Sequence, residues 1–385
     1  MTENNTPPKV VVIGGGYSGT LAANRLRMRG DWPMPDVTLL NARPAFVERI
    51  RLHQVAAGEY DAAVDYRTLL SEGVRLVVDT ATRIDWRARA VHLASGPALD
   101  YDYLVYAVGS TAAAPPSVPG VGEFAYPVAE LEHAQRLRER LDTLGPDAPV
   151  TVVGGGLTGI EVAAELAEQG RHVTLVCGGQ LGPALSERGR RSVGRALARL
   201  GVVVLAADTV VAVRPDAVVF ADGAVRPTAV TVWAAGFAVP QLAAASGLST
   251  DTIGRLRTDE TLTSVDDCRI VAAGDCAAPS TGPLRMCCAS ASQLGPQAAD
   301  TVLRRIAGTQ PVAARSRFLG NSCTSVGRRG GILQFGRSDE TPLNLYLGGR
   351  LAAAFKEAVC KGTLWGLRQQ ARRPESADWV TAGSS

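Results

Sequence analysis

Two stretches of this chain carry glycines at a spacing that could bind phosphate. In the first, Gly14, Gly16 and Gly19 follow the apolar run 10–13 and precede residues with helical spacing. Between a strand and a helix, the first glycine permits a tight turn, the second lets a pyrophosphate approach the backbone, and the third lets the helix pack closely. The helix would then point its N–H groups and positive dipole end at the phosphate. This stretch predicts a dinucleotide site rather than a plain structural turn.

The same pattern recurs later in the chain. Gly154, Gly156 and Gly159 follow the apolar run 150–153 and again precede residues with helical spacing. Two such fingerprints predict that one chain binds two dinucleotides.

The residues that end the second strand of each unit depart from the usual pattern. Dinucleotide folds place an acid there, which binds the ribose hydroxyls. The first unit has Asn41, which can accept a hydrogen bond but carries no charge, and the second has Cys177. Arginines 188, 190 and 191 follow in a predicted loop, where they either meet a 2′-phosphate or form a solvated helix face. We therefore expect weak discrimination between the two nicotinamide dinucleotides.

A further acid follows a later apolar strand. Residues 269–277 read RIVAAGDCA, so that Asp275 stands directly after Gly274 at the end of a buried strand. An acid at the carboxyl end of a strand suits a polyol hydroxyl bound in the crevice.

Composition narrows the class of protein. The 385 residues are 46% hydrophobic with a net charge of +3, which predicts two or more domains and does not favour nucleic acid as a partner. No apolar run approaches the ~20 residues of a membrane-spanning helix, and residues 1–8 lack a signal-peptide core. Seven cysteines without a regular framework fit a reducing cytoplasm. The four histidines are scattered, so we expect no metal site.

The remaining pattern predicts the elements that position these groups, and the fold class is α/β. Strands are expected at 36–40, 74–78, 90–93, 100–110 and 316–334, and helices at 130–144, 293–306 and 351–364. A second sheet is expected from 150–153, 172–176, 202–205, 210–214, 217–221 and 229–236.

Three further motifs accompany the two fingerprints, namely LVYAVGS at 104–110, VWAAGF at 232–237 and AAGD at 272–275. The order of these motifs along the chain is as informative as the motifs themselves. The chain resembles the two-dinucleotide-binding-domain flavoproteins of the pyridine nucleotide-disulfide oxidoreductase superfamily. LHQVAAG at 52–58 and the stretch 349–356 resemble the type II NADH dehydrogenase-like branch. The resemblance implies two Rossmann-like domains, with an FAD domain at 1–120 and 256–312 interrupted by an NAD(P) domain at 121–255. A small C-terminal α+β domain at 313–385 follows.

The resemblance also implies the cofactors, FAD and NAD(P)H, and their contacts. The residues expected to bind FAD are Gly14, Gly16, Ser18, Gly19, Asn41, Arg43, Gly109, Gly274 and Asp275. Those expected to bind NAD(P) are Gly154, Gly156, Gly159 and Gly236. Glu161 would present its charge to the incoming nicotinamide or acceptor, or else be a first-turn acid that complements the helix dipole. Lys356 matches a family position but could equally be a plain surface lysine.

The positions of the cysteines indicate whether disulfide reduction is to be expected. Disulfide reductases of this fold carry a cysteine pair shortly after the second strand, whereas residues 41–58 contain no cysteine. Cys287 and Cys288 are implied to lie near the flavin, but free cysteine is a routine buried residue. We do not expect disulfide reduction.

The function expected is transfer of hydride from NAD(P)H to FAD and then of two electrons to a quinone-like or other small-molecule acceptor. The alternatives are a flavoenzyme of secondary metabolism, a reductase of a partner redox protein, and a flavin-binding scaffold whose nicotinamide site has decayed. The basic stretch 364–373 predicts a docked C-terminal helix, or at most peripheral contact with the inner face of the membrane. The sequence leaves open whether the chain forms a homodimer.

Overall fold

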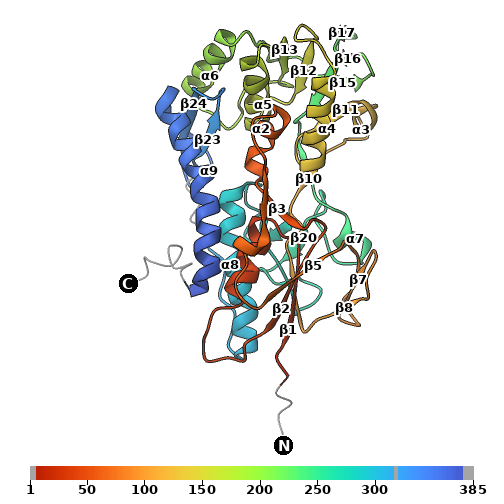
Figure 1. Ribbon diagram of the computed structural model, residues 1–385, viewed down its shortest axis with the longest axis vertical. Coiled ribbons are helices and arrows are strands. Elements are labelled where there is room, and N and C mark those ends of the chain that lie inside the picture. The colour runs from red at the N-terminus through yellow and green to blue at the C-terminus, as the bar shows by residue number, and fades with distance from the viewer. Residues whose placement is uncertain (1–5, 316–319, 376–385) are drawn as a thin grey trace, which may run out of the picture.

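The computed structural model describes residues 6–315 and 320–375 and divides into two halves along its long axis (Figure 1). The lower half is built on a parallel sheet of order β21-β9-β1-β2-β5. Its strands are β1 (Lys9–Ile13), β2 (Asp36–Asn41), β5 (Val74–Val78), β9 (Tyr103–Tyr106) and β21 (Ile270–Ala272). The run Val10–Ile13 is buried, as expected for a central strand covered on both faces.

Two helices pack against each other on this sheet, α1 (Tyr17–Arg25) and α8 (Cys288–Ile306). A Cβ added to Gly295 of α8 would lie 2.3 Å from the Ser18 carbonyl oxygen, so glycine is what permits this approach. The helix predicted at 293–306 therefore begins five residues earlier than expected. Its first turn contains small residues that pack against α1, and such residues give little hydrophobic periodicity.

The upper half holds a second parallel sheet, of order β11-β18-β12-β13-β14. The strands are β11 (Ala125–Pro127), β12 (Val150–Val153), β13 (Val173–Val176), β14 (Val203–Leu205) and β18 (Val230–Trp233). The helices are α4 (Leu131–Asp142), α5 (Leu157–Glu168) and α6 (Glu187–Arg199). Two Rossmann-like units are thus present, and the α/β class is confirmed.

Two segments expected in the second sheet form a sheet of their own. β15 (Val210–Val213), β16 (Ala217–Phe220) and β17 (Val225–Pro227) pair antiparallel. The connections between them are only a few residues long, whereas a parallel neighbour needs a crossover of about a dozen residues or more. The prediction that 210–214 and 217–221 belong to the same sheet as 150–153 was therefore wrong.

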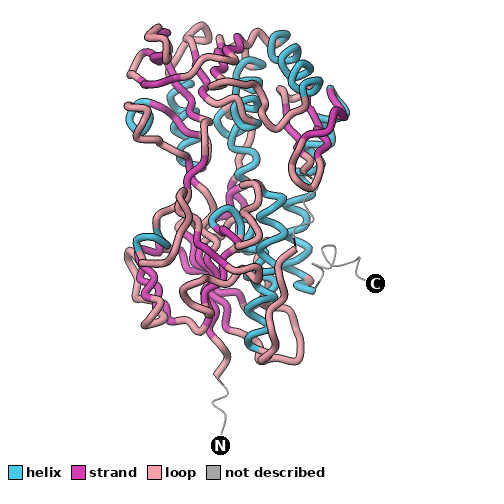
Figure 2. Tube along the Cα trace, turned by 180° about the vertical axis from the view of Figure 1, so that it is seen from behind, coloured by secondary structure: helices cyan, strands magenta, loops and turns pink. Residues whose placement is uncertain are grey.

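The two segments that join the first sheet to the second pair with each other. β10 (Thr111–Ala112) and β19 (Phe237–Ala238) form a short antiparallel ladder. Seen from behind, extended segments occupy the waist between the halves (Figure 2). The second sheet is therefore an insertion in the unit that begins and ends in the first.

The C-terminal part combines an antiparallel sheet with a long helix. Its elements are β23 (Ser322–Ser325), β24 (Gly331–Gly336), β25 (Pro342–Gly348) and α9 (Gly349–Arg372). α9 exceeds the predicted 351–364 and runs beside both halves (Figure 1). Leu367 is buried in the core of the first unit, which confirms a docked helix. Residues 316–319 of the predicted strand region lie outside the described residues. None of the described helices is long and apolar enough to cross a membrane.

Smaller elements complete the fold. The strand expected at 100–110 is shorter, because β9 covers only four residues and the chain then turns at Gly109. The minor helices are α2 (Leu52–Ala56), α3 (Val121–Phe124) and α7 (Leu242–Ala245), with 3-10 turns at Arg49–Arg51, Tyr66–Thr68 and Gly274–Cys276. The minor strands are β3 (Ala45–Val47), β4 (Ala63–Asp65), β6 (Ala81–Asp85), β7 (Ala90–Leu93), β8 (Leu99–Asp100), β20 (Leu256–Thr258) and β22 (Ala277–Pro279).

Candidate functional site

The first glycine of each fingerprint makes the same turn at the carboxyl end of a central strand. Gly14 follows β1 with φ +101°, and Gly154 follows β12 with φ +125°. A Cβ on Gly14 would lie 2.3 Å from the Ala107 carbonyl oxygen, and one on Gly154 would lie 2.6 Å from the Ala234 carbonyl carbon. Both positions therefore require glycine, because of the left-handed conformation and the neighbouring strand.

The third glycine of each fingerprint lets the helix approach the turn. A Cβ on Gly19 would lie 1.8 Å from the Gly14 carbonyl oxygen, and one on Gly159 would lie 1.9 Å from the Gly154 carbonyl oxygen. These contacts are with backbone and cannot be relieved by moving a side chain. The two fingerprints thus fold alike.

The second glycine of each fingerprint faces open space. A Cβ on Gly16 or Gly156 would meet nothing within 4 Å. Each residue is the N-cap of the following helix, α1 or α5, and neither helix has a side-chain cap. The space in front of each helix N-terminus fits a pyrophosphate, which the free N–H groups would bind.

Asp275 has a free oxygen at the carboxyl end of β21. Its Oδ2 accepts a hydrogen bond from Ser110 Oγ at 2.6 Å, whereas the buried Oδ1 has no partner among the described residues. Burial raises the pKa of this carboxyl. A polyol hydroxyl would satisfy Oδ1, so the site fits the ribityl chain of FAD, as does the glycine turn beside it.

Two of the predicted FAD contacts use their polar atoms within the protein. Ser18 Oγ donates to the Ala291 carbonyl of α8 at 2.8 Å. Asn41 Oδ1 accepts from the Gly15 N–H at 2.9 Å, and its Nδ2 donates to the Arg43 carbonyl at 2.8 Å. Asn41 therefore holds the glycine loop, a role that sequence reasoning missed.

The other predicted contacts lie around the same turn. The Arg43 guanidinium forms an ion pair with Glu132 of α4 in the second unit. Gly109 has φ +72° and lies beside Arg49, so a Cβ there would be 3.5 Å from Nη1 of that arginine. Gly236 has φ +82° and follows β18, at the same edge of the second sheet as Gly154.

The residues expected to read the nicotinamide nucleotide lie after β13. Cys177 is half-buried, and burial raises the pKa of its thiol to about 11. Arg188 is exposed in the first turn of α6, and Arg191 pairs with Glu187 at 3.2 Å. The predicted loop at 188–191 is thus helix, since Ser186 caps it by accepting a hydrogen bond from the Gly189 N–H.

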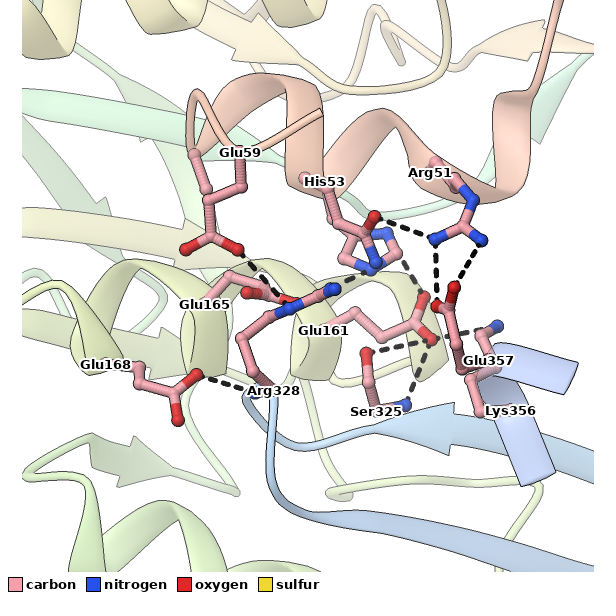
Figure 3. A network of polar contacts seen from close by, with 12 residues as sticks. Arg51, His53, Glu59, Glu161, Glu165, Glu168, Ser325, Arg328, Lys356 and Glu357 are labelled. Carbon is pink, nitrogen blue, oxygen red and sulfur yellow. Dashed lines mark hydrogen bonds and ion pairs between the residues drawn. The ribbon is translucent and has the colours of Figure 1, made fainter. Parts of the chain in front are cut away.

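Glu161 lies in the second turn of α5, so the alternative of a first-turn acid was wrong. Its Oε1 is 3.1 Å from Lys356 Nζ of α9 and accepts from the Ser325 N–H at 3.2 Å (Figure 3). Burial raises the pKa of this carboxyl, but Lys356 and His53 outweigh it and the pKa is lowered. Lys356 is not a plain surface residue, since its side chain is only 15% exposed, and the two groups form an ion pair largely shielded from water.

His53, from the LHQVAAG stretch, extends this pair into a network. Its Nδ1 is 3.7 Å from Glu161 Oε2, and its Nε2 is 3.8 Å from Oε1 of the fully buried Glu165. Burial lowers the pKa of His53 to about 4 and raises that of Glu165 to about 7. Sequence reasoning missed Glu165, although two acids four residues apart on an otherwise apolar helix were a usable signal.

Ion pairs join α2 to the C-terminal part on both sides of His53. Arg51 donates from both terminal nitrogens to Glu357 of α9, at 3.0 and 2.9 Å. Arg328 lies 3.4 Å from Glu165 and 3.5 Å from Glu59. The network therefore draws on both dinucleotide units and on the C-terminal part (Figure 3).

The cysteines do not form redox pairs in this structure. All seven are free, and burial raises the pKa of Cys288 to about 12. Cys287 Sγ is 3.3 Å from Ser290 Oγ at the start of α8. No three metal-ligating side chains come together in residues 6–315 and 320–375.

Comparison with known proteins gives the family. Residues 8–301 match the model of the pyridine nucleotide-disulphide oxidoreductases. An NADH dehydrogenase-like protein of Mycobacterium tuberculosis is 32% identical over 301 residues, covering 70% of this chain and 73% of the relative. Demethylphylloquinone reductase of Synechocystis is 28% identical, covering 70% and 71% of the two chains. The type II NADH:quinone oxidoreductase of Haemophilus influenzae is 26% identical, covering 70% and 73%.

Solved structures share the whole fold. Sulfide:quinone oxidoreductase from Aquifex aeolicus matches with a TM-score of 0.80 and 22% identity, covering 97% of this chain and 94% of that one. NDH2 from Plasmodium falciparum, in complex with NADH, matches with a TM-score of 0.78 and 17% identity, covering 97% and 98%. The chain thus belongs to the pyridine nucleotide-disulphide oxidoreductase family, is NADH dehydrogenase-like within it, and is an NAD(P)H oxidoreductase that uses FAD.

Proposed function

We propose that this enzyme passes the two electrons of NAD(P)H to a quinone-like small molecule. FAD, held by the first glycine loop and Asp275, would supply the hydride acceptor and the two-electron donor. The observation that carries the proposal is the buried Glu161–Lys356 pair. Reduction of a quinone to a quinol consumes two protons, and a carboxylate beside an ammonium can hold and deliver protons at a site shielded from water.

Contacts along α8 link this pair to the predicted flavin site. The backbone N–H of Cys287 favours the charged form of Asp275 and so opposes the rise in its pKa. The next residue, Cys288, is close enough to Lys356 for the ammonium to oppose the rise in its thiol pKa. Residues 287 and 288 at the start of α8 therefore link the predicted flavin contact Asp275 to Lys356 of the pair.

Two facts favour a quinone over a disulfide. Residues 41–58, which would carry a redox cysteine pair, contain none, and His53 and Arg51 point into the network from this stretch instead. The relatives from Haemophilus influenzae and Synechocystis are named for quinone substrates.

The test separates the two halves of the reaction. In anaerobic stopped-flow experiments, NADH or NADPH should bleach the flavin, and menadione or a short-chain ubiquinone should reoxidise it faster than a ferredoxin or an aromatic disulfide does. Glu161→Gln should slow reoxidation while leaving the FAD content unchanged. An enzyme that only the ferredoxin reoxidises would be a reductase of a redox protein instead.

The finer part of the proposal is peripheral contact with a membrane, where quinones reside. Five residues of α9, namely Leu351, Phe355, Ala358, Gly362 and Trp365, follow helical spacing and are all exposed. Leu351 is 69% and Trp365 63% exposed, and Arg368 and Arg372 follow them. An apolar stripe beside basic residues suits an anionic lipid surface. Sedimentation with phosphatidylglycerol vesicles should fall when Leu351 and Trp365 are both changed to Glu, and equal sedimentation would exclude this surface.

A further inference from the structure

We propose that His53 and Glu165 conduct a proton from the protein surface to Glu161. This inference rests on the proposed function, in which Glu161 delivers a proton to the acceptor. Neither residue is among those predicted to bind FAD or NAD(P), so both are expected to act on the proton supply.

The geometry places the imidazole between two carboxylates. Nδ1 lies 3.7 Å from Glu161 Oε2, and Nε2 lies 3.8 Å from Glu165 Oε1. The ring is only 3% exposed, and Glu161 and Glu165 are consecutive acids on one face of α5 (Figure 3). The two ring nitrogens therefore face different acids, which is the arrangement that a histidine needs to accept a proton on one side and release it on the other.

Two unpaired atoms mark the path. Among the described residues, His53 Nε2 and Glu165 Oε2 are buried and have no hydrogen-bond partner. Buried polar atoms are nearly always paired, and two unpaired ones in adjacent residues call for an explanation. Proton exchange between the two side chains requires an uncommitted ring nitrogen and an uncommitted carboxyl oxygen, and these two atoms supply them.

At its outer end the path reaches the protein surface beside Arg328. Its guanidinium lies 3.4 Å from Glu165 Oε1 and 3.5 Å from Glu59 Oε2, and its side chain is 43% exposed. The backbone N–H of Arg328 donates to Glu168 Oε2 at 2.6 Å, so a third acid of α5 lies at the same edge. Glu165 itself is fully buried, so its reprotonation by water requires the half-exposed Arg328 side chain to move aside.

Charges on all sides determine where the proton resides. The cations Lys356, Arg328 and Arg51 oppose protonation of His53, and burial keeps the ring neutral. Burial and the carboxylates of Glu59 and Glu168 favour the protonated form of Glu165. Of the other groups, Glu161 pairs with Lys356, and Glu357 pairs with Arg51. Near neutral pH the group that can hold a proton is thus the Glu165 carboxyl, and the adjacent imidazole is neutral.

The transfer conserves protons and charge. The Glu165 carboxyl proton passes to Nε2 while the Nδ1 proton passes to the Glu161 carboxylate, so the ring stays neutral and changes tautomer. Glu165 then takes a proton from water, and the ring returns to its first tautomer when Nε2 releases a proton to water and Nδ1 takes one up, an exchange that consumes no net proton. NAD(P)H and a quinone require one proton from solvent per turnover to form NAD(P)+ and quinol, which is the proton that this path supplies.

The kinetic test uses the FAD-loaded enzyme and menadione. His53→Gln keeps hydrogen bonding but cannot exchange a proton between two ring nitrogens, and Glu165→Gln removes the proton donor. Each should slow flavin reoxidation at least tenfold, with a larger solvent deuterium effect, while NADH-dependent bleaching changes less than twofold. Added imidazole should partly restore the His53→Gln rate. The matched control is His172→Gln, an exposed histidine outside the network.

The outcomes separate the two proposals. If quinones reoxidise the wild type and both variants at the same rate, the path is excluded while the proposed function stands. Equal losses in bleaching and reoxidation, without rescue by imidazole, would show a structural role and also exclude the path. If no quinone reoxidises the wild type, the proposed function falls and the path with it.

A second readout tests where the proton resides without any turnover. Glu165 has a raised pKa of about 7, so its stabilisation is present below the unfolded value and is lost as the pH rises through about 7. His53 has a lowered pKa of about 4, so its stabilisation is present above the unfolded value near 6.5 and is lost as the pH falls through about 4. The two effects oppose each other between pH 7 and pH 5. On acidification over this range, Tm should therefore rise in His53→Gln and fall in Glu165→Gln, and parallel shifts would exclude this proton distribution.

Discussion

The two glycine loops share one backbone geometry but differ in what holds them. In the first loop, the Gly15 carbonyl accepts hydrogen bonds from Tyr66 Oη at 2.6 Å and Thr20 Oγ1 at 3.1 Å. The Gly15 N–H donates to Asn41 Oδ1 at 2.9 Å. Three side chains from different parts of the first unit therefore fix this loop.

The second loop is held by backbone alone. The Gly155 carbonyl accepts from the Gly182 N–H at 2.7 Å, and a Cβ on Gly155 would lie 2.6 Å from the Cβ of Cys177. Within residues 6–315 and 320–375, no side chain donates to Gly155. A loop fixed by side chains suits a cofactor that stays bound, and a less constrained loop suits a nucleotide that exchanges in every turnover. The difference matches the predicted roles of FAD and NAD(P)H.

The largest expected effect comes from the third glycines, because their clashes are with backbone. Gly19→Ala should lower the stability by roughly 1–3 kcal/mol and prevent FAD from being retained. Gly159→Ala should keep FAD but slow bleaching by NADH about 100-fold, or ~2.7 kcal/mol. Absorbance of the purified variants and stopped-flow bleaching measure both. Gly16→Ala, whose Cβ would meet nothing within 4 Å, is the control for stability. Loss of FAD from Gly159→Ala would contradict the assignment of the two loops to different nucleotides.

Asp275 stands three residues beyond the end of β21, the strand beside β9, and Glu130 stands three residues beyond β11, the matching strand beside β18, where it accepts a hydrogen bond from Thr111 Oγ1. Asp275→Ala removes a charged hydrogen bond to FAD, worth roughly 1.5–3 kcal/mol, so FAD should bind about 10- to 100-fold more weakly. FAD fluorescence after dialysis measures the change. Ser110→Ala, which removes only the group that positions Asp275, should have a smaller effect. Full FAD occupancy in Asp275→Ala would count against this contact.

A weaker effect is expected at Cys177, where no acid or arginine contacts the ribose. The wild type should use NADH and NADPH with kcat/KM values within about tenfold of each other, or ~1.4 kcal/mol. Cys177→Glu should shift the preference toward NADH, since a carboxylate accepts from the ribose and repels a 2′-phosphate. Steady-state kinetics decide this. A strong preference for NADPH that Arg188→Ala abolishes would instead make Arg188 the specificity residue.

The smallest effect tests the side-chain support itself. Tyr66→Phe removes one of two hydrogen bonds to the Gly15 carbonyl and should lower the free energy of unfolding by about 1 kcal/mol. Cys177→Ala, at the matching place in the second unit, should change it by less, because the Cβ that contacts Gly155 is kept and the thiol donates no hydrogen bond to that loop. Denaturant unfolding of the FAD-loaded proteins compares them. Equal losses would mean that the two loops are supported alike.

The sequence predicted most of what depends on local pattern. The two strand–glycine–helix units, the helix at 130–144 and the acid after β21 follow from periodicity and turn chemistry over ten to fifteen residues. The resemblance added Glu161 and Lys356 as candidate residues, and the structure brings them together as an ion pair. The wrong sheet assignment at 210–221 arose because alternating residues predict a strand but not its partner, and only the short connections decide the pairing.

What could not be predicted depends on long-range contacts. His53 of α2 meets Glu161 of α5, which belongs to the second unit, and Arg43 pairs with Glu132 although 89 residues separate them. Asn41 had the right residue type to bind a ribose hydroxyl, and its actual bond to Gly15 depends on how closely two loops approach. Burial is equally non-local, since Lys356 has the sequence context of a surface lysine and becomes buried only when α9 docks.

The insertion of the second unit has a consequence for how the chain folds during synthesis. The strands of the second sheet lie together between residues 125 and 233, so this unit can complete its sheet as soon as it leaves the ribosome. The first sheet must wait for β21, which pairs with β9 some 160 residues earlier, although its N-terminal strands are made first. Domains generally form as units during translation, and long-range parallel pairing is slow. The nascent chain therefore holds an unfinished, apolar β9 edge until residues 270–272 arrive, and the predicted FAD contact Asp275 becomes available only after that.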